Sequence, residues 1–173
     1  MVFLTVLILI LPAFVLSNKK AESKIYLVTQ NNTAPTKHIG TIKIKELNNG
    51  QFEFKGDLND LPSGQHGFHI HQNHSIDNAC IAAGAHLNLY NNTHGGLNSQ
   101  VRHEGDLGNI FTDDKGKTKI DIKVNGLDFN STANLLSRTL VVHQLVDDLG
   151  LGNNDASRTT GNSGTRIACG LIN

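Results

Sequence analysis

The chain has 173 residues, a length that fits one domain built around a single hydrophobic core. Its 15 basic and 15 acidic side chains cancel at neutral pH, which argues against nucleic acid as a partner. The sequence closes on ACGLIN without a basic tail, so we expect no heparin-type tail that would hold polyanionic glycans.

The first sixteen residues, MVFLTVLILILPAFVL, carry no charged side chain and precede Lys19 and Lys20. This pattern predicts a signal peptide over residues 1–17, a mature domain over residues 18–173 and secretion to the extracellular space. The alternative is an uncleaved N-terminal membrane anchor, although the run is shorter than the ~20 residues that a spanning helix needs and contains Pro12.

Short runs rich in Ile, Val, Phe and Thr follow the leader, and several alternate apolar with polar residues, as strands do. The clearest is TIKIKELNNGQFEF, which predicts a hairpin turning at Asn49 and Gly50. No later stretch keeps a helical apolar period, so the sequence predicts an all-β antiparallel sandwich or barrel with little helix. The predicted strands are residues 25–29, 41–47, 52–56, 67–71, 118–124 and 139–143.

Two long segments interrupt this pattern, residues 72–107 and 144–166, and both are rich in Gly, Asn and His. Long loops inside a compact domain are usually functional. Cys80 lies in the first loop and Cys169 just beyond the second, and an even cysteine count in an exported chain makes their pairing the first hypothesis. The alternative is two buried free thiols.

Four Asn-X-Ser/Thr motifs are consistent with a glycosylated, secreted protein. They begin at Asn31, Asn73, Asn91 and Asn130.

Histidines carry the strongest chemical signal. His69 and His71, in GFHIH, are two residues apart, so on a strand they project from one face with bases roughly 6 to 7 Å apart and can converge on one metal. Imidazole suits copper and zinc, an all-imidazole set matches copper, and a set that includes a carboxylate matches zinc. The further candidate ligands are His86, His94, His103, Asp106 and His143, whereas His38, His66 and His74 look incidental.

Six motifs resemble, in order and spacing, those of the copper/zinc superoxide dismutases. They are GFHIH, GAHLN, HGG, RHEGDLGNI, RTLVVHQLVDDLG and TGNSGTRIACG. The resemblance covers about residues 24–172. It implies an eight-stranded Greek-key barrel, paired as a homodimer or a higher homo-oligomer, with the metals held outside the barrel by two long loops.

Carried over by position, the resemblance also assigns roles. It implies copper ligands His69, His71, His86 and His143, and zinc ligands His86, His94, His103 and Asp106, so that His86 bridges the metals and acts in catalysis. It implies that Asp147 hydrogen-bonds a ligand of each metal, that Cys80 and Cys169 form the intrachain disulfide, and that Arg166 faces the copper.

The chain departs from the family pattern in several places. Leu145 and Thr159 replace two lysines that frequently guide the substrate in the family, and Arg158 is the residue next to Thr159. Ser137 replaces a common glycine. We therefore expect a weaker or redistributed field for attracting an anion.

These observations predict a secreted enzyme that converts superoxide to dioxygen and hydrogen peroxide with copper and zinc as cofactors. One alternative is a non-enzymatic copper- and zinc-binding or buffering protein on the same fold, which would not need Arg166 beside an open copper site. A copper chaperone with a similar domain is a third interpretation, but it would lack some copper ligands and carry more cysteines.

Overall fold

The computed structural model describes residues 19–28, 36–129 and 134–173. The predicted signal peptide, the motifs at Asn31 and Asn130, and residue 29 of the first predicted strand lie outside the described residues. Within the described part of the chain, no helix has the length and hydropathy needed to cross a lipid bilayer.

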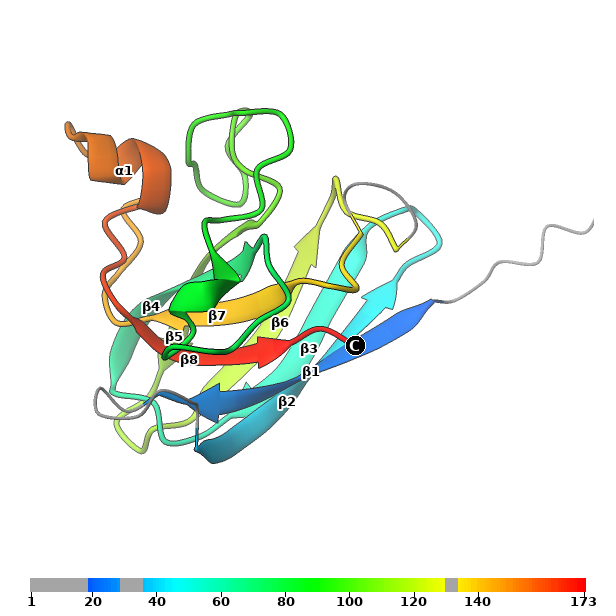
Figure 1. The fold of residues 1–173 in the computed structure, drawn as a ribbon, viewed down its shortest axis with the longest axis vertical. Helices are drawn as coiled ribbons and strands as arrows, with labels where there is room; N and C mark the ends of the chain where they lie inside the picture. Colours follow the sequence, from blue (N-terminus) through cyan, green and yellow to red (C-terminus); the bar gives the residue numbers. More distant parts are fainter. Residues whose placement is uncertain (1–18, 29–35, 130–133) are drawn as a thin grey trace, which may run out of the picture.

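Eight strands close into an antiparallel barrel in the order β1-β2-β3-β6-β5-β4-β7-β8 (Figure 1). Strand β7 returns beside β4 after the meander β4-β5-β6, which is a Greek-key arrangement. The all-β barrel predicted from the sequence is therefore confirmed. The strands are β1 (Lys20–Leu27), β2 (Lys37–Glu46), β3 (Phe52–Leu58), β4 (Gly64–His71), β5 (Asp106–Thr112), β6 (Thr118–Val124), β7 (Thr139–His143) and β8 (Arg166–Leu171).

The β2-β3 hairpin shows how the alternating pattern builds the barrel. Ile44 pairs with Phe54 across the two strands, and both side chains are buried in the core. The chain reverses through Gly50, which has a φ of +78° and donates its N–H to Leu47 O at 2.9 Å. Glycine suits that left-handed backbone because it has no Cβ.

Two strands were missing from the sequence prediction, β5 and β8. Strand β5 contains Gly108, at a φ of +79°, and Asn109, neither of which favours strand formation. Strand β8 contains Gly170, where an added Cβ would lie 2.1 Å from Lys24 O of the neighbouring β1. Strand β1 also begins five residues earlier than predicted, at Lys20.

Both predicted loops rise from the same end of the barrel (Figure 1). The first runs from Gln72 to β5 and includes the short 3₁₀ turn η1 (Ile81–Ala83), and the second, between β7 and β8, includes the one short helix of the described chain, α1 (Asp155–Thr160). The loops touch where the His94 N–H donates to Arg158 O at 2.7 Å. The side chain of Asn154 caps α1 by accepting the Ser157 N–H at 2.7 Å.

Ser137 lies in the turn before β7 and has a φ of +83°. A left-handed backbone strains any residue with a Cβ, which gives a physical reason for glycine at this position.

A disulfide joins Cys80 and Cys169, the pairing expected from the sequence, so neither thiol is free. Both residues are fully buried, with Cys80 directly before η1 and Cys169 paired with Val141 of β7 in the sheet. The bond therefore fixes the first loop to the barrel wall.

We predict that Cys80→Ser lowers stability, because the disulfide closes a loop with a sequence separation of 89 residues. Loss of such a bond costs about 4 kcal/mol, which corresponds to a fall in Tm of about 10 °C for a domain of this size. Calorimetry of the variant beside the parent, oxidised and thiol-reduced, checks this. An oxidised parent with the Tm of the variant would contradict it.

Candidate metal centre

Four buried imidazoles form the first cluster: His69, His71, His86 and His143. Strand β4 supplies the first pair, the first loop supplies His86, and the last residue of β7 supplies His143. One nitrogen from each ring lies within 4.8 Å of one nitrogen from each of the others. These are the four residues to which the family resemblance assigned the role of copper ligands.

Backbone carbonyls fix the orientation of two of these rings. His71 Nδ1 lies 2.8 Å from Gly84 O, and His143 Nδ1 lies 3.2 Å from Gly164 O. A carbonyl can only accept, so each Nδ1 carries the hydrogen, and the two Nε2 atoms, 3.2 Å apart, are directed into the cluster. Such contacts present a defined nitrogen to a metal.

The second cluster contains a carboxylate. Its members with ligand atoms within 4.8 Å of one another are His69, His86, His94 and Asp106. Asp106 Oδ1 accepts from His86 Nδ1 at 2.8 Å, and Asp106 Oδ2 lies 3.0 Å from His94 Nδ1. The clusters share His69 and His86, and His86 directs Nδ1 toward Asp106 and Nε2 away from it.

His103, the fourth residue of the expected zinc set, stands beside this compact group rather than inside it. Its Nδ1 lies 3.2 Å from Asp106 Oδ1, while its Nε2 lies 3.1 Å from Asn92 O. The second contact leaves Nδ1 as the nitrogen available to a metal. His69 takes the place of His103 in the compact group, which the sequence did not indicate.

Asp147 connects one ring of each cluster. Its Oδ2 accepts from His69 Nε2 at 2.8 Å and its Oδ1 accepts from His94 Nε2 at 2.8 Å. Asn109 of β5 holds the main chain of Asp147, because its amide donates to Asp147 O and accepts the Asp147 N–H, each at 2.8 Å. Asn109 was not among the predicted site residues, and its position in the RHEGDLGNI motif was the only signal for it.

Two ring nitrogens at the centre are buried and have no hydrogen-bond partner among the described residues: His69 Nδ1 and His86 Nε2. An unsatisfied buried polar atom costs about 1 to 3 kcal/mol, so two together require an explanation. Metal coordination provides one, because each nitrogen belongs to a cluster whose donors suit copper or zinc.

Burial and charge set the protonation of the ligands. Burial, reinforced by neighbouring histidines, holds the pKa of His69 and of His71 well below the ordinary value, and lowers the pKa of His143 to about 3. These rings are therefore neutral at pH 7, the form that binds metals.

The carboxylates reverse this effect at the second cluster. Burial lowers the pKa of His94, but Asp106 and Asp147 outweigh it and raise the value to about 9. Burial raises the pKa of Asp106, but hydrogen bonds from His103, His86 and His94 outweigh it and hold that pKa well below the ordinary range. The second cluster thus favours positive charge, as a cation site should.

Arg166 begins β8 at the edge of the first cluster. Its guanidinium donates to the carbonyls of Cys80, Ile81 and Gly84, and the last of these also accepts from His71 Nδ1. The positive charge contributes to the lowered pKa of both His71 and His143. Arg166 also lines a surface hollow of about 520 Å³. A cation therefore lies beside the imidazole cluster and faces an accessible hollow.

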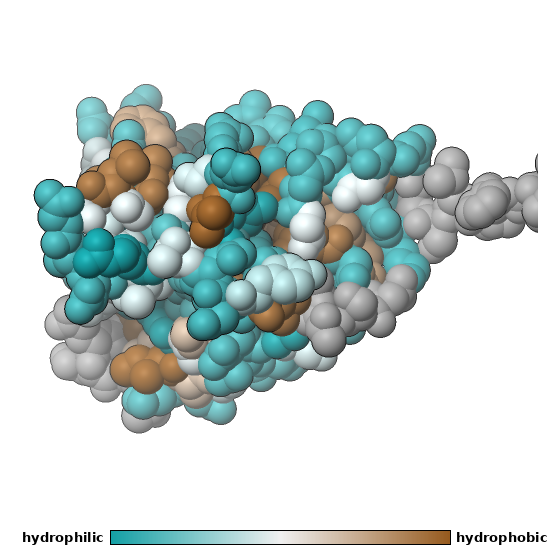
Figure 2. Space-filling model, turned by 90° about the horizontal axis from the view of Figure 1, so that it is seen from above, coloured by the Kyte–Doolittle hydropathy of each residue, from teal (hydrophilic) through white to brown (hydrophobic). Residues whose placement is uncertain are grey.

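The residues that replace family lysines lie in the second loop, between β7 and β8. Leu145 is 52% exposed, and Thr159 Oγ1 donates to Asp155 O at 2.9 Å. Arg158 forms an ion pair with Asp155 at 3.3 Å, so its charge is partly compensated. Figure 2, seen from above the loops, shows a mainly hydrophilic surface with small separate hydrophobic patches.

The three histidines considered incidental lie outside both clusters. His66 is buried and bridges Pro62 O and His143 O at 2.8 and 2.9 Å, so its role is to tie the chain before β4 to the end of β7. His38 and His74 are exposed.

Comparisons with known proteins agree with this geometry. The family model described as "Copper/zinc superoxide dismutase (SODC)" matches residues 38–172. An extracellular Cu-Zn superoxide dismutase of Caenorhabditis elegans is 40% identical over 139 residues, or 80% of this chain and 62% of that protein. The chain thus spans less than two thirds of that relative.

Two other relatives are covered more fully. Superoxide dismutase (Cu-Zn) 4 of Dictyostelium discoideum is 44% identical over 77% of this chain and 89% of its own length, and an extracellular Cu-Zn superoxide dismutase of Haemonchus contortus is 39% identical over 88% and 82%. A crystal structure of the clock protein EA4 aligns with a TM-score of 0.79 and 30% identity over 90% of this chain and 94% of that one.

The family match includes every residue of both clusters. The chain belongs to the copper/zinc superoxide dismutase family, whose enzymes use copper and zinc to convert superoxide to dioxygen and hydrogen peroxide.

Proposed function

We propose that the chain is a secreted superoxide dismutase in which His69, His71, His86 and His143 hold copper. His86, His94, His103 and Asp106 hold zinc. The observation that carries this assignment is the position of His86, whose Nδ1 contacts Asp106 while its Nε2 is buried without a partner among the described residues.

Copper, when bound, supplies one-electron exchange in both directions, and zinc supplies a fixed positive charge that holds the second cluster together. The protein groups provide the rest. His86 Nε2 is the atom at which the chain can hold a proton and release it to the product. The reaction consumes two protons for every two superoxide anions, so a proton-carrying group at the site has a direct use.

Arg166 binds and orients the anion. Its guanidinium presents several fixed donors and a permanent charge, and the loop carbonyls of Cys80, Ile81 and Gly84 hold it in place. Asp147 keeps the His69 and His94 rings in their orientations, as partners of metal ligands generally do.

Secretion is supported by the names of the relatives, two of which are extracellular enzymes, and by the disulfide, which persists in oxidising compartments. We also propose cleavage after residue 17 and a homodimeric assembly without a nucleic-acid partner. Of the two described sequons, Asn91 is the better glycan acceptor: Asn73 is also exposed, but its amide donates to Ala82 O at 3.0 Å.

The metal assignment predicts one copper and one zinc per chain, measured by elemental analysis of the purified mature protein. His103→Ala should lower zinc content several-fold and retain copper, because His103 contacts Asp106 but is not in the four-imidazole cluster. His74→Ala, an exposed histidine outside both clusters, is the matched control. Equal loss of both metals in the His103 variant would refute the division into two sets.

The role of Arg166 predicts that Arg166→Ala lowers the rate of superoxide consumption about tenfold or more at low salt while both metals stay bound. The salt dependence of the rate should flatten, because screening acts over ~8 Å at physiological ionic strength. Arg158→Ala, which removes a charge already paired with Asp155, should change the rate little. If the Arg166 variant matched the parent in rate and salt slope, Arg166 would not guide the substrate and a metal-buffering function would have to be reconsidered.

Export predicts that protein recovered from the medium of a eukaryotic host begins near residue 18 and carries N-glycan at Asn91 rather than Asn73. N-terminal sequencing and peptide mass spectrometry check both points, with Asn91→Gln as the control. A chain retained in the membrane fraction with residues 1–17 attached would instead indicate an anchor.

A further inference from the structure

The surface hollow beside Arg166 has a volume of about 520 Å³ and is bounded by the first loop, the chain after β1 and the start of β8. Sites for small molecules usually measure about 300 to 1,000 Å³, so the hollow is large enough for a ligand. None of the described residues that line it belongs to either metal cluster. The hollow is therefore a separate feature that meets the metal centre only through Arg166.

One side of the hollow is apolar and already held in place. Val28 and Ile167 pack against buried hydrophobic side chains, and the Val28 N–H donates to Ile167 O at 2.8 Å. Ile81 of η1 completes this side and is 60% exposed, and its neighbour Cys80 is fixed to the barrel by the disulfide. A preformed apolar surface binds a matching ligand without a cost for ordering the protein first.

The other side offers hydrogen-bond donors. An arginine guanidinium carries five N–H groups. In Arg166 three of them donate to loop carbonyls, which leaves Nε–H and one hydrogen of Nη2. Gln144 adds a side-chain amide, because its Oε1 accepts from the Thr165 hydroxyl at 2.7 Å while its Nε2 has no hydrogen-bond partner among the described residues. Two donors on one guanidinium match the two oxygens of a carboxylate.

The charge of the hollow favours a ligand with a single anionic group. Arg166 is the one charged residue among the described residues that line it. A small inorganic anion would leave the apolar side uncovered. A neutral apolar molecule would cover the guanidinium without pairing it, and desolvating an unpaired charge is costly. A carboxylate with an apolar body satisfies both sides.

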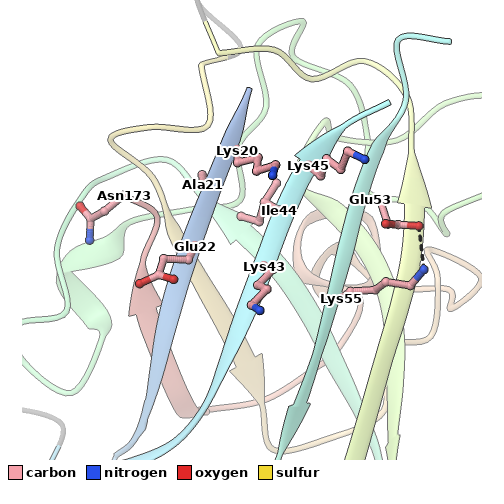
Figure 3. Close-up of a pocket in the computed structure, with 9 residues that line it drawn as sticks. All are labelled: Lys20, Ala21, Glu22, Lys43, Ile44, Lys45, Glu53, Lys55 and Asn173. Atoms are coloured by element: carbon pink, nitrogen blue, oxygen red, sulfur yellow. Dashed lines mark hydrogen bonds and ion pairs between the residues drawn. The ribbon is translucent and has the colours of Figure 1, made fainter. Parts of the chain in front are cut away.

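The hollow on the outer surface of β1, β2 and β3, of about 580 Å³, has a different character (Figure 3). Charged side chains surround it, and Glu53 and Lys55 form an ion pair there at 2.9 Å. None of the exposed large hydrophobic side chains of the described residues lies on these three strands. Positive charge is thus present without an apolar wall, which makes this face the place for a control substitution.

We propose that the hollow beside Arg166 binds a small monocarboxylate with an apolar body, and that the bound carboxylate competes with superoxide for Arg166. The carboxylate accepts from the two remaining donors of Arg166, and the apolar body covers Val28, Ile81 and Ile167. The competition rests on the anion-binding role proposed above for Arg166, whereas the binding itself does not.

The test is calorimetric titration of purified, metal-loaded protein with octanoate and with acetate at equal ionic strength. Octanoate should bind at least tenfold more tightly, because each buried methylene group favours binding about fourfold. Ile81→Thr should weaken octanoate several-fold and leave acetate unchanged, and it should keep its Tm and both metals because the side chain is largely exposed. Arg166→Gln should weaken both ligands about tenfold or more.

Two control variants separate this site from general attraction. Leu151→Thr changes an apolar side chain of the second loop that is 82% exposed and does not line the hollow. Lys43→Gln removes one positive charge from the hollow of Figure 3. Both should bind octanoate as the parent does. Octanoate binding no tighter than acetate, or equal weakening in the Ile81 and Leu151 variants, would overturn the proposal.

The rate of superoxide consumption tests the competition separately. Octanoate should lower the rate of the parent at concentrations where calorimetry shows binding, and elemental analysis should find copper and zinc retained. Binding without any effect on the rate would support the ligand site and contradict the role proposed for Arg166. Inhibition accompanied by loss of metal would overturn the competition, because octanoate would then act by removing a cofactor.

Discussion

The hydrogen bonds that Asp147 accepts from His69 and His94 are the interaction on which the rest of the site depends. They join a residue of the second loop to a ring on β4 and to a ring in the first loop, so three separate segments meet at one carboxylate. Asp147 is fully enclosed, and its main chain is clamped by Asn109 of β5. A buried carboxylate held in this way is costly to move, which makes it a rigid reference for both clusters.

The second loop is shaped to leave room for this contact. Gly161 ends α1 with a φ of +65°, and a Cβ at that position would lie 2.0 Å from Asp147 Oδ1 and 2.5 Å from His94 Nε2. Glycine is therefore required at this position for two reasons: the backbone is left-handed, and Asp147 and His94 approach too closely for a Cβ. The first loop is held by different means, the disulfide and the carbonyl of Gly84, which accepts from both His71 and Arg166. Through that shared carbonyl, the Arg166 guanidinium and the His71 ring are held next to each other.

Much of this could be predicted from the sequence, for reasons that are local. Alternation marked β2 and β3 because one face of each strand is buried, and the two-residue spacing placed His69 and His71 together because strand side chains alternate. Strands β5 and β8 were missed because each contains a glycine, a residue whose local propensity argues against a strand. Gly108 allows a left-handed backbone in β5, and Gly170 allows close contact between β8 and β1. The proximity of His69 to the second cluster and the clamp by Asn109 depend on contacts between distant segments, which no local pattern encodes.

The same limit applies to charge. In the sequence, Arg158 looked like a substitute for the lysine missing at Thr159, but α1 places its guanidinium three residues from Asp155, within ion-pair distance. Burial lowers the pKa of all four rings of the first cluster, His69, His71, His86 and His143, so these rings are neutral and contribute little attraction. Under the proposed function, attraction of a small anion would come mainly from the metal ions and from Arg166, all within the site. A field of that kind acts over a short range, because the Debye length at physiological salt is ~8 Å. Under the same proposal, the chain would position its anion with a few fixed groups inside the site, whereas guiding lysines would act earlier, at the surface.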